Sequence, residues 1–225
     1  GRPRRSLFSA NFAGLNSEGV PTFLNEDGER VLQFDLQERD GLQDILIFEG
    51  STEPRGSGGF TNTISYKGFS LMGLLSFKFG YKIRLNDAFF ATYTDFDALP
   101  GELVDRWAVP GDEDLTNIPT IVDRNVAQAD GNVSLAYQLY NKSTERVANG
   151  DYVRLKTLRL TYTLPLNFIS KYGFSNANVA IEGQNLALLY SDQENLRGQD
   201  PEFFSTGGVA LPQPRLITFS LNVGF

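Results

Sequence analysis

The chain has 225 residues, of which 41% are hydrophobic and 21% charged, so it can bury a sizeable apolar surface and is not composed like a disordered chain. It contains no Cys and no His, which excludes disulfides, Cys-based zinc sites, thiol nucleophiles and any catalysis that needs a His base. The net charge of −7 argues against a nucleic-acid partner, because phosphate contacts need clustered Lys and Arg. We therefore expect no enzyme, no cofactor, no metal centre and no nucleic-acid partner.

Residues 1–58 are polar and rich in turn formers, and we expect them to form a long connection. They contain one basic cluster, Arg2, Arg4 and Arg5, which is expected in a solvated loop. The N-terminus has no apolar stretch of the signal-peptide kind, so a secreted protein with this sequence would be a piece of a longer precursor. The run Gly56 to Gly59 is followed by no Lys-Ser/Thr, so it is not a phosphate loop, and we expect a flexible approach to a strand.

Residues 59–82 are predicted to form a hairpin that turns at Lys67-Gly68. Its second strand exceeds the ordinary length of soluble strands and has aromatic residues towards its ends. The apolar residues of this strand alternate and share a face: Phe69, Leu71, Gly73, Leu75, Phe77, Phe79 and Tyr81. Lys78 lies on the opposite, more polar face.

Residues 83–151 are predicted to form a second long, polar connection. It contains an acidic run, Asp112 to Asp114, whose carboxylates are of the type that binds calcium, although a solvated acidic loop is the preferred interpretation. It also contains Trp107 beside Arg106. This pair is expected to anchor its own loop, with a contact to a sugar or to a partner protein as the alternative.

A second hairpin is predicted over residues 152–189, a third long connection over 190–213 and a terminal strand over 214–225. Alternation is regular in both hairpin strands until Leu186 to Tyr190, which is apolar on both faces. Asp200 and Glu202 in the third connection are expected to structure the loop or contact a partner, rather than to act as paired catalytic carboxylates. The terminal strand alternates without exception, and its apolar face is expected to form an assembly signal: Phe219, Leu221, Val223 and Phe225.

Long strands joined alternately by short and long connections favour a transmembrane β-barrel, whose turns are short at one end and long at the other. Counting back from the last strand places both short turns on the periplasmic side and all three long connections outside. Charged residues would then point to the lumen, because charge on the lipid face is costly. The residues expected on the lumen face are Lys78, Arg159, Glu182 and Gln184. The pattern leaves a secreted β-sandwich that binds carbohydrate open as the alternative, since sandwich strands also alternate.

Several phrases, in order along the chain, resemble the C-terminal part of the SusC/RagA family of TonB-dependent outer-membrane transporters of Bacteroidetes. The resemblance covers nearly the whole chain, and six phrases in this order are specific although none is specific alone. The phrases are Gly14 to Gly19, Tyr66 to Phe69, Arg106 to Asp112, Tyr152 to Pro165, Gly183 to Leu186 with Asp200 to Glu202, and Pro212 to Phe225.

The resemblance implies an all-β chain that supplies about five strands and three extracellular loops of a large barrel, 22-stranded in the family and closed by a plug that this sequence lacks. It also implies import of glycan or peptide fragments in the cell outer membrane, without catalysis. The implied partners are the rest of the barrel and its plug, a SusD-like surface lipoprotein, the TonB system acting on an absent N-terminal part, the barrel-assembly machinery and the lipid bilayer. A passive diffusion barrel is a further alternative, and the imported solute is not determined by the sequence.

Overall fold

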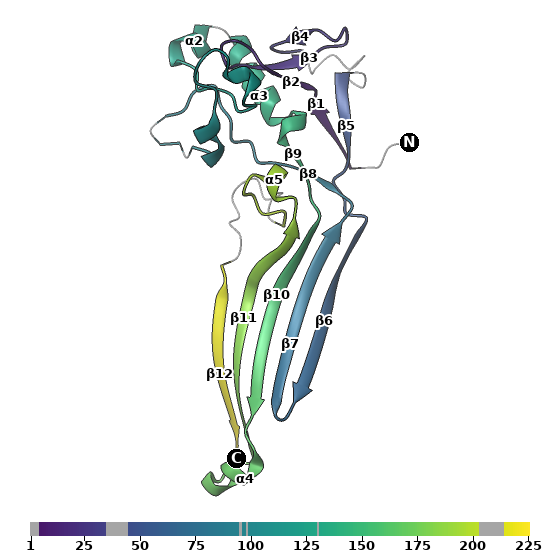
Figure 1. The fold of residues 1–225 in the computed structure, drawn as a ribbon, viewed down its shortest axis with the longest axis vertical. Helices are drawn as coiled ribbons and strands as arrows, with labels where there is room; N and C mark the ends of the chain where they lie inside the picture. The colour runs from purple at the N-terminus through teal and green to yellow at the C-terminus, as the bar shows by residue number, and fades with distance from the viewer. Residues whose placement is uncertain (1–4, 35–44, 95, 98, 130, 203–213) are drawn as a thin grey trace.

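The computed structural model describes residues 5–34, 45–94, 96–97, 99–129, 131–202 and 214–225. A tall sheet of long strands, here called the wall, has a more compact part at one of its ends, here called the head (Figure 1). The head comprises the described residues of 5–55 and 80–151, and residues 192–202 contact both the head and the wall. Arg2 and Arg4 of the predicted basic cluster and residues 203–213 of the third connection lie outside the described residues.

The wall is a single antiparallel sheet whose strand order is β12-β11-β10-β7-β6. Its strands are β6 (Gly56–Tyr66), β7 (Phe69–Phe79), β10 (Tyr152–Thr163), β11 (Asn176–Ser191) and β12 (Leu216–Gly224). β7 and β10 are neighbours in the sheet although most of the head lies between them in the chain. The expectation of about five long strands is confirmed, and within the described residues no second sheet covers the wall as a β-sandwich would require.

The two short connections of the wall lie at the end away from the head (Figure 1). β6 turns into β7 at Lys67 and Gly68, whose φ angles of 45° and 86° are both positive, as a two-residue type I′ hairpin requires. β10 passes into β11 through a one-turn helix α4 (Leu166–Ile169) and a 3₁₀ turn η4 (Ser170–Tyr172). The chain therefore returns towards the head at this end by two compact connections.

Two irregularities explain why the sequence alternation fails in β11. The pairing of β10 with β11 shifts between Leu155 and Thr157, and again between Val153 and Arg154. Asn185 lies at the first shift with a φ of 51°, the left-handed conformation that Asn tolerates better than most residues. Such bulges move the following side chains to the opposite face. The apolar run Leu186 to Tyr190 therefore follows a change of register.

The expectation of a flexible approach at Gly56 to Gly59 is wrong, because these residues are the first part of strand β6. They pair with β7 in register, with Gly56 opposite Phe79 and Gly58 opposite Phe77. A Cβ atom added to Gly56 would lie 2.3 Å from the Phe79 ring, so the ring occupies the space above the glycine. Glycine at an edge strand is stabilised by such an aromatic neighbour.

The head contains short strands, α-helices and 3₁₀ turns, although the sequence predicted long connections there (Figure 1). Its strands pair as β1 with β5, β2 with β3 and β4, and β8 with β9. They are β1 (Ser6–Ala10), β2 (Phe12–Leu15), β3 (Pro21–Leu24), β4 (Arg30–Val31), β5 (Leu46–Ser51), β8 (Lys82–Arg84) and β9 (Val147–Asn149). Its helices and turns are η1 (Gly101–Asp105), η2 (Asp112–Asp114), α2 (Arg124–Ala129), α3 (Gly131–Asn141) and η3 (Thr144–Arg146), and α5 (Gln193–Leu196) lies beside it in residues 192–202.

Helix α3 supplies much of the hydrophobic core of the head. Its buried side chains Val133, Ala136, Tyr137 and Tyr140 recur at the three- and four-residue spacing of one helix face. They pack in one cluster with Phe23 of β3 and with residues of the 88–122 segment. Burial raises the pKa of Tyr140 well above its ordinary value, with nearby Arg side chains opposing the effect. These segments are therefore a folded body with its own core.

Tyr81 departs from the predicted strand pattern. Gly80 has a φ of 78°, which ends β7 and turns the chain into β8, so Tyr81 does not share the face of Phe77 and Phe79. Its ring is 4% exposed in a second core cluster with Ile83. The shared apolar face therefore ends at Phe79, and the prediction that it continues to Tyr81 is wrong. No helix in the described part of the chain has the length and apolarity needed to cross a membrane.

Candidate functional site

One face of the wall is apolar and exposed over all five strands. Cross-strand partners share a face, so the pairing register gives the rows of side chains directly. Two successive rows are entirely apolar or aromatic: Tyr66, Phe69, Tyr162, Val179 and Leu221 in one, and Ile64, Leu71, Leu160, Ile181 and Phe219 in the next. Every side chain of the second row is between 40% and 78% exposed. A contiguous apolar surface of this kind marks a surface that another apolar phase or protein covers.

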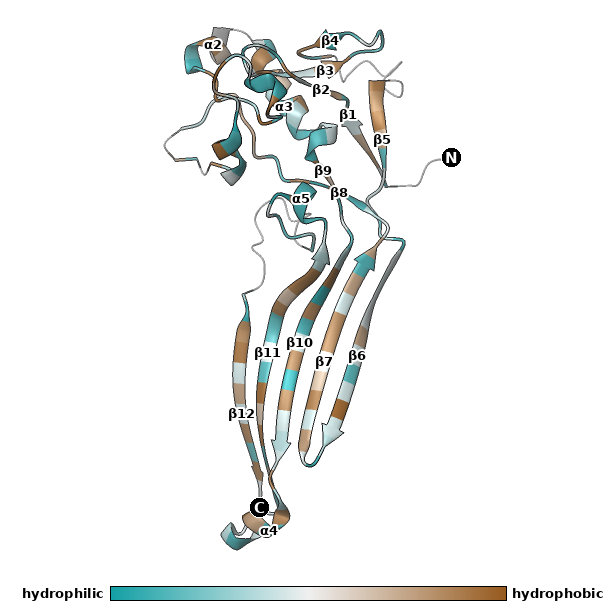
Figure 2. Ribbon diagram, in the orientation of Figure 1, coloured by the Kyte–Doolittle hydropathy of each residue, from teal (hydrophilic) through white to brown (hydrophobic). Residues whose placement is uncertain are grey.

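The opposite face of the wall is largely polar. One row across the sheet consists of Thr63, Met72, Arg159, Glu182 and Thr218. Bands of alternating hydropathy along each strand are visible in Figure 2. The wall therefore separates apolar from polar side chains as a strand period of two allows.

The four residues predicted to face a lumen all lie on this polar face. Arg159 pairs with Glu182 across β10 and β11, with 3.4 Å between nitrogen and oxygen. Gln184 donates a 2.7 Å hydrogen bond to the same carboxylate. Lys78 lies opposite Tyr152, nearer the head. The structure brings three of the four together, and their role in a lumen stays a prediction.

Near the head, the polar face carries a tighter cluster built on β10. The Arg154 side chain is 5% exposed, and its guanidinium donates to both Asp200 oxygens, at 2.6 Å to Oδ1, and at 2.9 Å to the Asn185 side chain. Its Nε lies 3.1 Å from Glu202 without the alignment of a hydrogen bond. Lys156 donates to both Glu202 oxygens at 2.7 and 2.8 Å. Asp200 and Glu202 are thus bound to the wall, and these contacts fit the predicted loop-structuring role.

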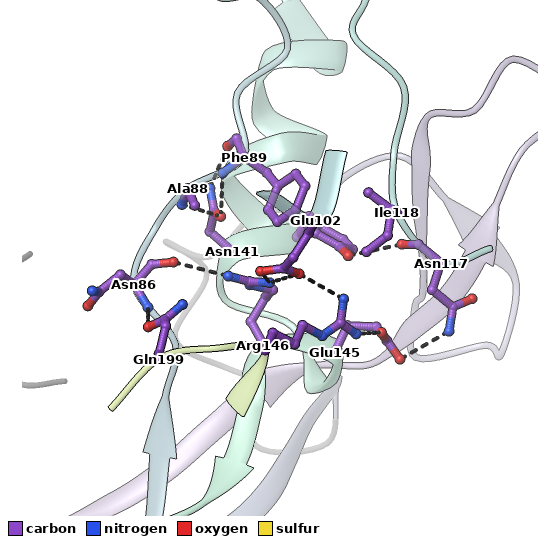
Figure 3. A network of polar contacts seen from close by, with 12 residues as sticks. Asn86, Ala88, Phe89, Glu102, Asn117, Ile118, Asn141, Glu145, Arg146 and Gln199 are labelled. Carbon is purple, nitrogen blue, oxygen red and sulfur yellow. Dashed lines mark hydrogen bonds and ion pairs between the residues drawn. The ribbon is translucent and has the colours of Figure 1, made fainter. Parts of the chain in front are cut away.

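Asp200 and Glu202 belong to a segment, residues 192–202, that we call the strap. The strap also binds the head, through Arg197. Its guanidinium donates to Glu102 at 2.9 Å and to Glu145 at 2.7 Å. Glu102 in turn accepts two hydrogen bonds from Arg146, at 2.8 and 3.1 Å (Figure 3). Two arginines therefore share one carboxylate at the centre of this network.

Arg146 is the most enclosed charge of this network, with a side chain exposure of 0%. It donates to the Asn86 carbonyl at 3.3 Å, and its guanidinium lies 4.9 Å from the centre of the Phe89 ring. Asn86 N–H donates at 3.0 Å to the side chain of Gln199 in the strap, as Figure 3 shows. Buried charges are tolerated where they are paired and hydrogen-bonded, and this arginine meets both conditions.

Apolar contacts also hold the strap. Leu196 of α5 is 2% exposed and packs in one cluster with Tyr81 and Ile83. Asp192 caps the same short helix and accepts a 3.0 Å hydrogen bond from the Asn149 N–H of β9. Burial raises the pKa of Tyr81 far above its ordinary value, and the neighbouring Tyr152 and Asp151 add to the effect. The strap is therefore fixed both to the wall and to the head.

Trp107 contacts its own loop, in keeping with the anchor that the sequence predicts. Its indole N–H donates to Glu113 at 2.9 Å, and its ring lies over Gly19, where an added Cβ would be 2.6 Å away. Asp112 accepts from the Ala108 and Val109 N–H groups at 2.9 and 3.0 Å. These hydrogen bonds lower the pKa of Asp112, and the Trp107 hydrogen bond is the first cause of a lowered pKa at Glu113. The acidic run is thus engaged in bracing the loop.

The remaining predicted site residues are Arg106 and those of the terminal strand. Arg106 is exposed and donates to the Leu103 carbonyl at 3.0 Å, so it braces its own loop. The four residues of the expected assembly signal lie on the apolar face, with Phe225 93% and Phe219 78% exposed. Among the described residues, no group of three or more acidic side chains is placed to hold a metal ion. The signal role of the terminal strand stays a prediction.

Sequence reasoning missed the buried arginines Arg146 and Arg154 and the partly buried Arg197. Simple alternation counted from Leu158 assigns Arg154 to the apolar face of β10. The bulge between Leu155 and Thr157 instead moves Arg154 to the polar face. Arg146 and Arg197 lie in segments predicted as solvated connections. Their partners are 44 to 95 residues away in the chain, and no local pattern signals such pairs.

No protein-family model matches the sequence. Over 92% of its length, in an alignment of 224 positions, the chain is 30% identical to TonB-dependent receptor P26 of Formosa agariphila. Over 75% of its length it is 24% identical to TonB-dependent receptor P39 of the same organism. It covers 20% and 16% of these relatives, so it spans a fifth or less of their length. None of these proteins is named as an enzyme.

Solved structures of the RagAB peptide importer have the same fold. The open-open state superposes with a TM-score of 0.64 at 20% identity, over 98% of this chain and 22% of the other. A second RagAB peptide transporter structure gives a TM-score of 0.58 at 22% identity, over 88% of this chain and 20% of the other. The chain is thus similar in sequence to TonB-dependent receptors, and its open five-stranded sheet has the fold of part of the barrel wall of the RagAB importer, as the resemblance to the SusC/RagA family implies.

Proposed function

We propose that the chain forms part of the wall and the outer surface of a TonB-dependent importer in the cell outer membrane. The observation that carries this proposal is the exposed apolar face of the wall opposite a polar face. Charged residues on a lipid face cost about 2 to 4 kcal/mol near the middle of the membrane, which explains why Arg159 and Glu182 lie on the other face. In this arrangement the apolar face contacts lipid and the polar face lines the lumen or contacts the plug.

The orientation of the chain follows from the two ends of the wall. The compact connections at Lys67 and at α4 would face the periplasm, where barrel turns are short, and the head would face outside. The strap would then lie at the outer mouth of the lumen, between the wall and the head. The described residues of the expected extracellular segments 1–58, 83–151 and 190–213 lie mostly in the head and the strap, whereas Gly56 to Gly58 and Tyr190 to Ser191 belong to wall strands.

The imported solute is proposed to be a glycan or peptide fragment, delivered with a SusD-like surface lipoprotein that rests on the head. The solved structures of RagAB are named as those of a peptide importer or transporter, which supports the peptide class. Energy would come from the TonB system, and the plug and the other strands would be supplied by the rest of the receptor. The open sheet needs those strands, because unpaired backbone groups at its edges would cost several kcal/mol each in hydrocarbon.

The terminal strand is proposed to be the segment that the barrel-assembly machinery engages. Its apolar face, Phe219, Leu221, Val223 and Phe225, is fully displayed before the barrel forms. Deleting Phe225 should lower the amount of assembled receptor in the outer membrane, measured by fractionation against a Thr218→Ser control on the exposed polar face of the same strand. An unchanged amount of receptor would contradict this role.

Transport is tested in the intact receptor in its own cell. Uptake of labelled oligosaccharides and labelled peptides should require the receptor gene and should stop when TonB is removed or the proton gradient is collapsed. Uptake of one class that persists without TonB would indicate a passive diffusion barrel instead. Recovery of the receptor in the soluble fraction without detergent would favour the carbohydrate-binding module and would overturn the membrane proposal.

A further inference from the structure

The connection between β10 and β11, residues 164–175, projects beyond the wall at the end opposite the head (Figure 1). We call it the foot. It is longer than a tight barrel turn and contains α4 and η4. Ile169 is buried at 3% exposure, whereas Leu166, Phe168 and Tyr172 are 65%, 55% and 67% exposed. The foot thus has an interior of its own and displays large apolar side chains outside it.

The exposed aromatic residues of the foot are held in place by their neighbours. The rings of Phe168 and Tyr172 lie 5.8 Å apart. Phe174 packs edge-on against Phe225 at 5.3 Å, and the Ser175 N–H donates to the Gly224 carbonyl at 2.8 Å. The foot is therefore an ordered structure fastened to the end of β12.

The apolar surface of the foot is continuous with the apolar face of the wall. Phe225 continues the alternation of Phe219, Leu221 and Val223, and its ring touches Phe174 of the foot. The row of Tyr66, Phe69, Tyr162, Val179 and Leu221 lies at the same end of the wall. Tyr and Trp gather where the hydrocarbon meets the headgroups, because their rings have an apolar body and a polar edge.

The charged side chains at this end of the wall are positive. The foot carries Lys171, and the neighbouring hairpin carries Lys67, whose Nζ lies 5.2 Å from the centre of the Tyr66 ring. The sequence has no Asp or Glu from residue 56 to 79, from 152 to 181 or from 214 to 225. Lysines beside aromatic rings suit a surface of phosphate groups over hydrocarbon, since the stem packs on apolar groups while the amine reaches the phosphates.

We propose that the foot lies in the headgroup region of the inner leaflet of the outer membrane, with Phe168 and Tyr172 inserted at the acyl-chain boundary and Lys171 and Lys67 on phospholipid phosphates. This proposal rests on the proposed membrane function of the wall and adds a lipid-binding surface to it. The foot then fixes the depth of the β10–β11 hairpin in the bilayer, as interfacial amphipathic segments do.

The test uses the intact receptor in phospholipid nanodiscs, with single cysteines that carry an environment-sensitive fluorophore. This chain has no Cys, so Phe168→Cys, Phe219→Cys and Val104→Cys each give one site in it. Lipids brominated near the headgroup end of the acyl chain should quench the Phe168 site about two-fold or more, as an interfacial depth requires. They should quench the Phe219 site as well and leave the Val104 site on the head unchanged.

Quenching of the Phe168 site by aqueous iodide and not by bromolipid would overturn the proposal, and so would quenching by neither, which would indicate a protein cover. If Phe219 is quenched by bromolipid in those cases, the wall proposal stands and the foot proposal alone fails. If Phe219 is not quenched, the membrane function itself fails. Tyr172→Cys repeats the test at a second exposed site of the foot and guards against a local effect of Phe168→Cys.

The charge contribution is tested with Lys171→Gln in the Phe168→Cys receptor. In nanodiscs of phosphatidylglycerol, the loss of one Lys near an anionic surface weakens the attraction about five-fold, so bromolipid quenching should fall. In phosphatidylcholine the fall should be smaller. Equal quenching of the two variants in both lipids would remove the phosphate contact from the proposal.

Discussion

In the head, apolar side chains point inward and charges are either exposed or paired in the interior, whereas the wall places its apolar side chains outward. Tyr140 of α3 is fully buried, while Phe219 of β12 is 78% exposed. Both regions nevertheless follow the same rule, that apolar groups leave water. The difference lies in what surrounds them, because the head makes its own apolar environment and the wall relies on an external one.

The largest expected effect is at Arg146, which is enclosed in the head. Arg146→Met leaves Glu102 with one partner fewer in the interior, and breaking a buried pair costs about 3 to 5 kcal/mol. We expect a value near the lower end, since Arg197 still neutralises Glu102. Native-state hydrogen exchange of α3 and η3 in the intact receptor measures the loss as a lower free energy of local unfolding.

The control for this prediction is the exposed ion pair between Lys142 and Asp87, whose side chains are 52% and 49% exposed. Lys142→Gln should cost less than about 1 kcal/mol, as exposed pairs usually do. Adding Glu102→Gln to Arg146→Met should recover part of the loss, because it removes the buried carboxylate charge. Equal losses of unfolding free energy for Arg146→Met and Lys142→Gln would show that burial does not increase the contribution of an ion pair to the stability of the head.

The next largest effect is expected where a charged side chain is placed on the apolar face of the wall. Leu160 is in the middle of the apolar face, so Leu160→Arg should reduce the stability of the assembled receptor by about 2 to 4 kcal/mol. Thr161→Arg places the same side chain on the polar face one residue further along β10, and should cost little. Unfolding of the receptor by guanidinium in lipid vesicles compares the two variants. A larger loss for Thr161→Arg would mean that the two faces of the wall have been assigned the wrong way round.

A smaller effect is expected at the junction of the two regions, where Gly150 precedes β10. A Cβ there would lie 2.4 Å from the Tyr81 ring, so Gly150→Ala forces one of them to move. Overpacking of this kind costs about 1 to 3 kcal/mol. Gly101→Ala is a suitable control because nothing lies within 4 Å of its added Cβ. Thermal unfolding of both variants decides whether the junction is as tightly packed as the head.

The smallest effect is a pH response of the loop braced by Trp107. The pKa values of Asp112 and Glu113 lie below their ordinary values of 3.8 and 4.5, because both carboxylates accept hydrogen bonds. A carboxylate with a lower pKa in the folded state stabilises that state above its ordinary pKa, and this contribution is lost as the pH falls through the folded pKa. The protection factors of residues 106–118 against hydrogen exchange, which correct for the intrinsic pH dependence of exchange, should therefore fall on acidification below about pH 4.

Glu113→Gln separates this response from general acid unfolding. Its amide oxygen can still accept the Trp107 hydrogen bond but does not titrate in this range. The variant should show a weaker pH dependence in the same loop and an unchanged one in α3. An identical acid response of variant and parent would remove Glu113 as a cause.

The wall could be predicted from the sequence because its information is local. The alternation of Ile217 to Phe225 and the turn at Lys67-Gly68 specify strands and a hairpin without reference to the rest of the chain. Lys78, Arg159, Glu182 and Gln184 were expected to face a lumen on the basis of parity alone, and the structure places all four on one face of the wall. Parity failed at Lys156, where β10 has one residue more than β7 and the faces are inverted, and at Tyr81, which follows the turn at Gly80.

The head could not be predicted in the same way. Its strands are two to six residues long, too short for a period to stand out, and its core joins residues from segments far apart in the chain. The positions of Arg146, Arg154 and Arg197 depend on carboxylates dozens of residues away, so burial of these charges is a property of the assembled structure. Likewise, the strap is anchored at both ends only because the wall and the head already stand next to each other.

The sequence by itself therefore determined the strand class, the two faces of the wall and the family resemblance, since each depends on neighbouring residues or on short phrases. The tertiary structure decided that the long connections are folded and that Glu102 lies between two arginines. It also decided that the foot displays its aromatic side chains at the far end of the wall. The physical reason is that periodic patterning acts over a few residues, whereas burial and charge pairing depend on segments that meet only when the chain has folded.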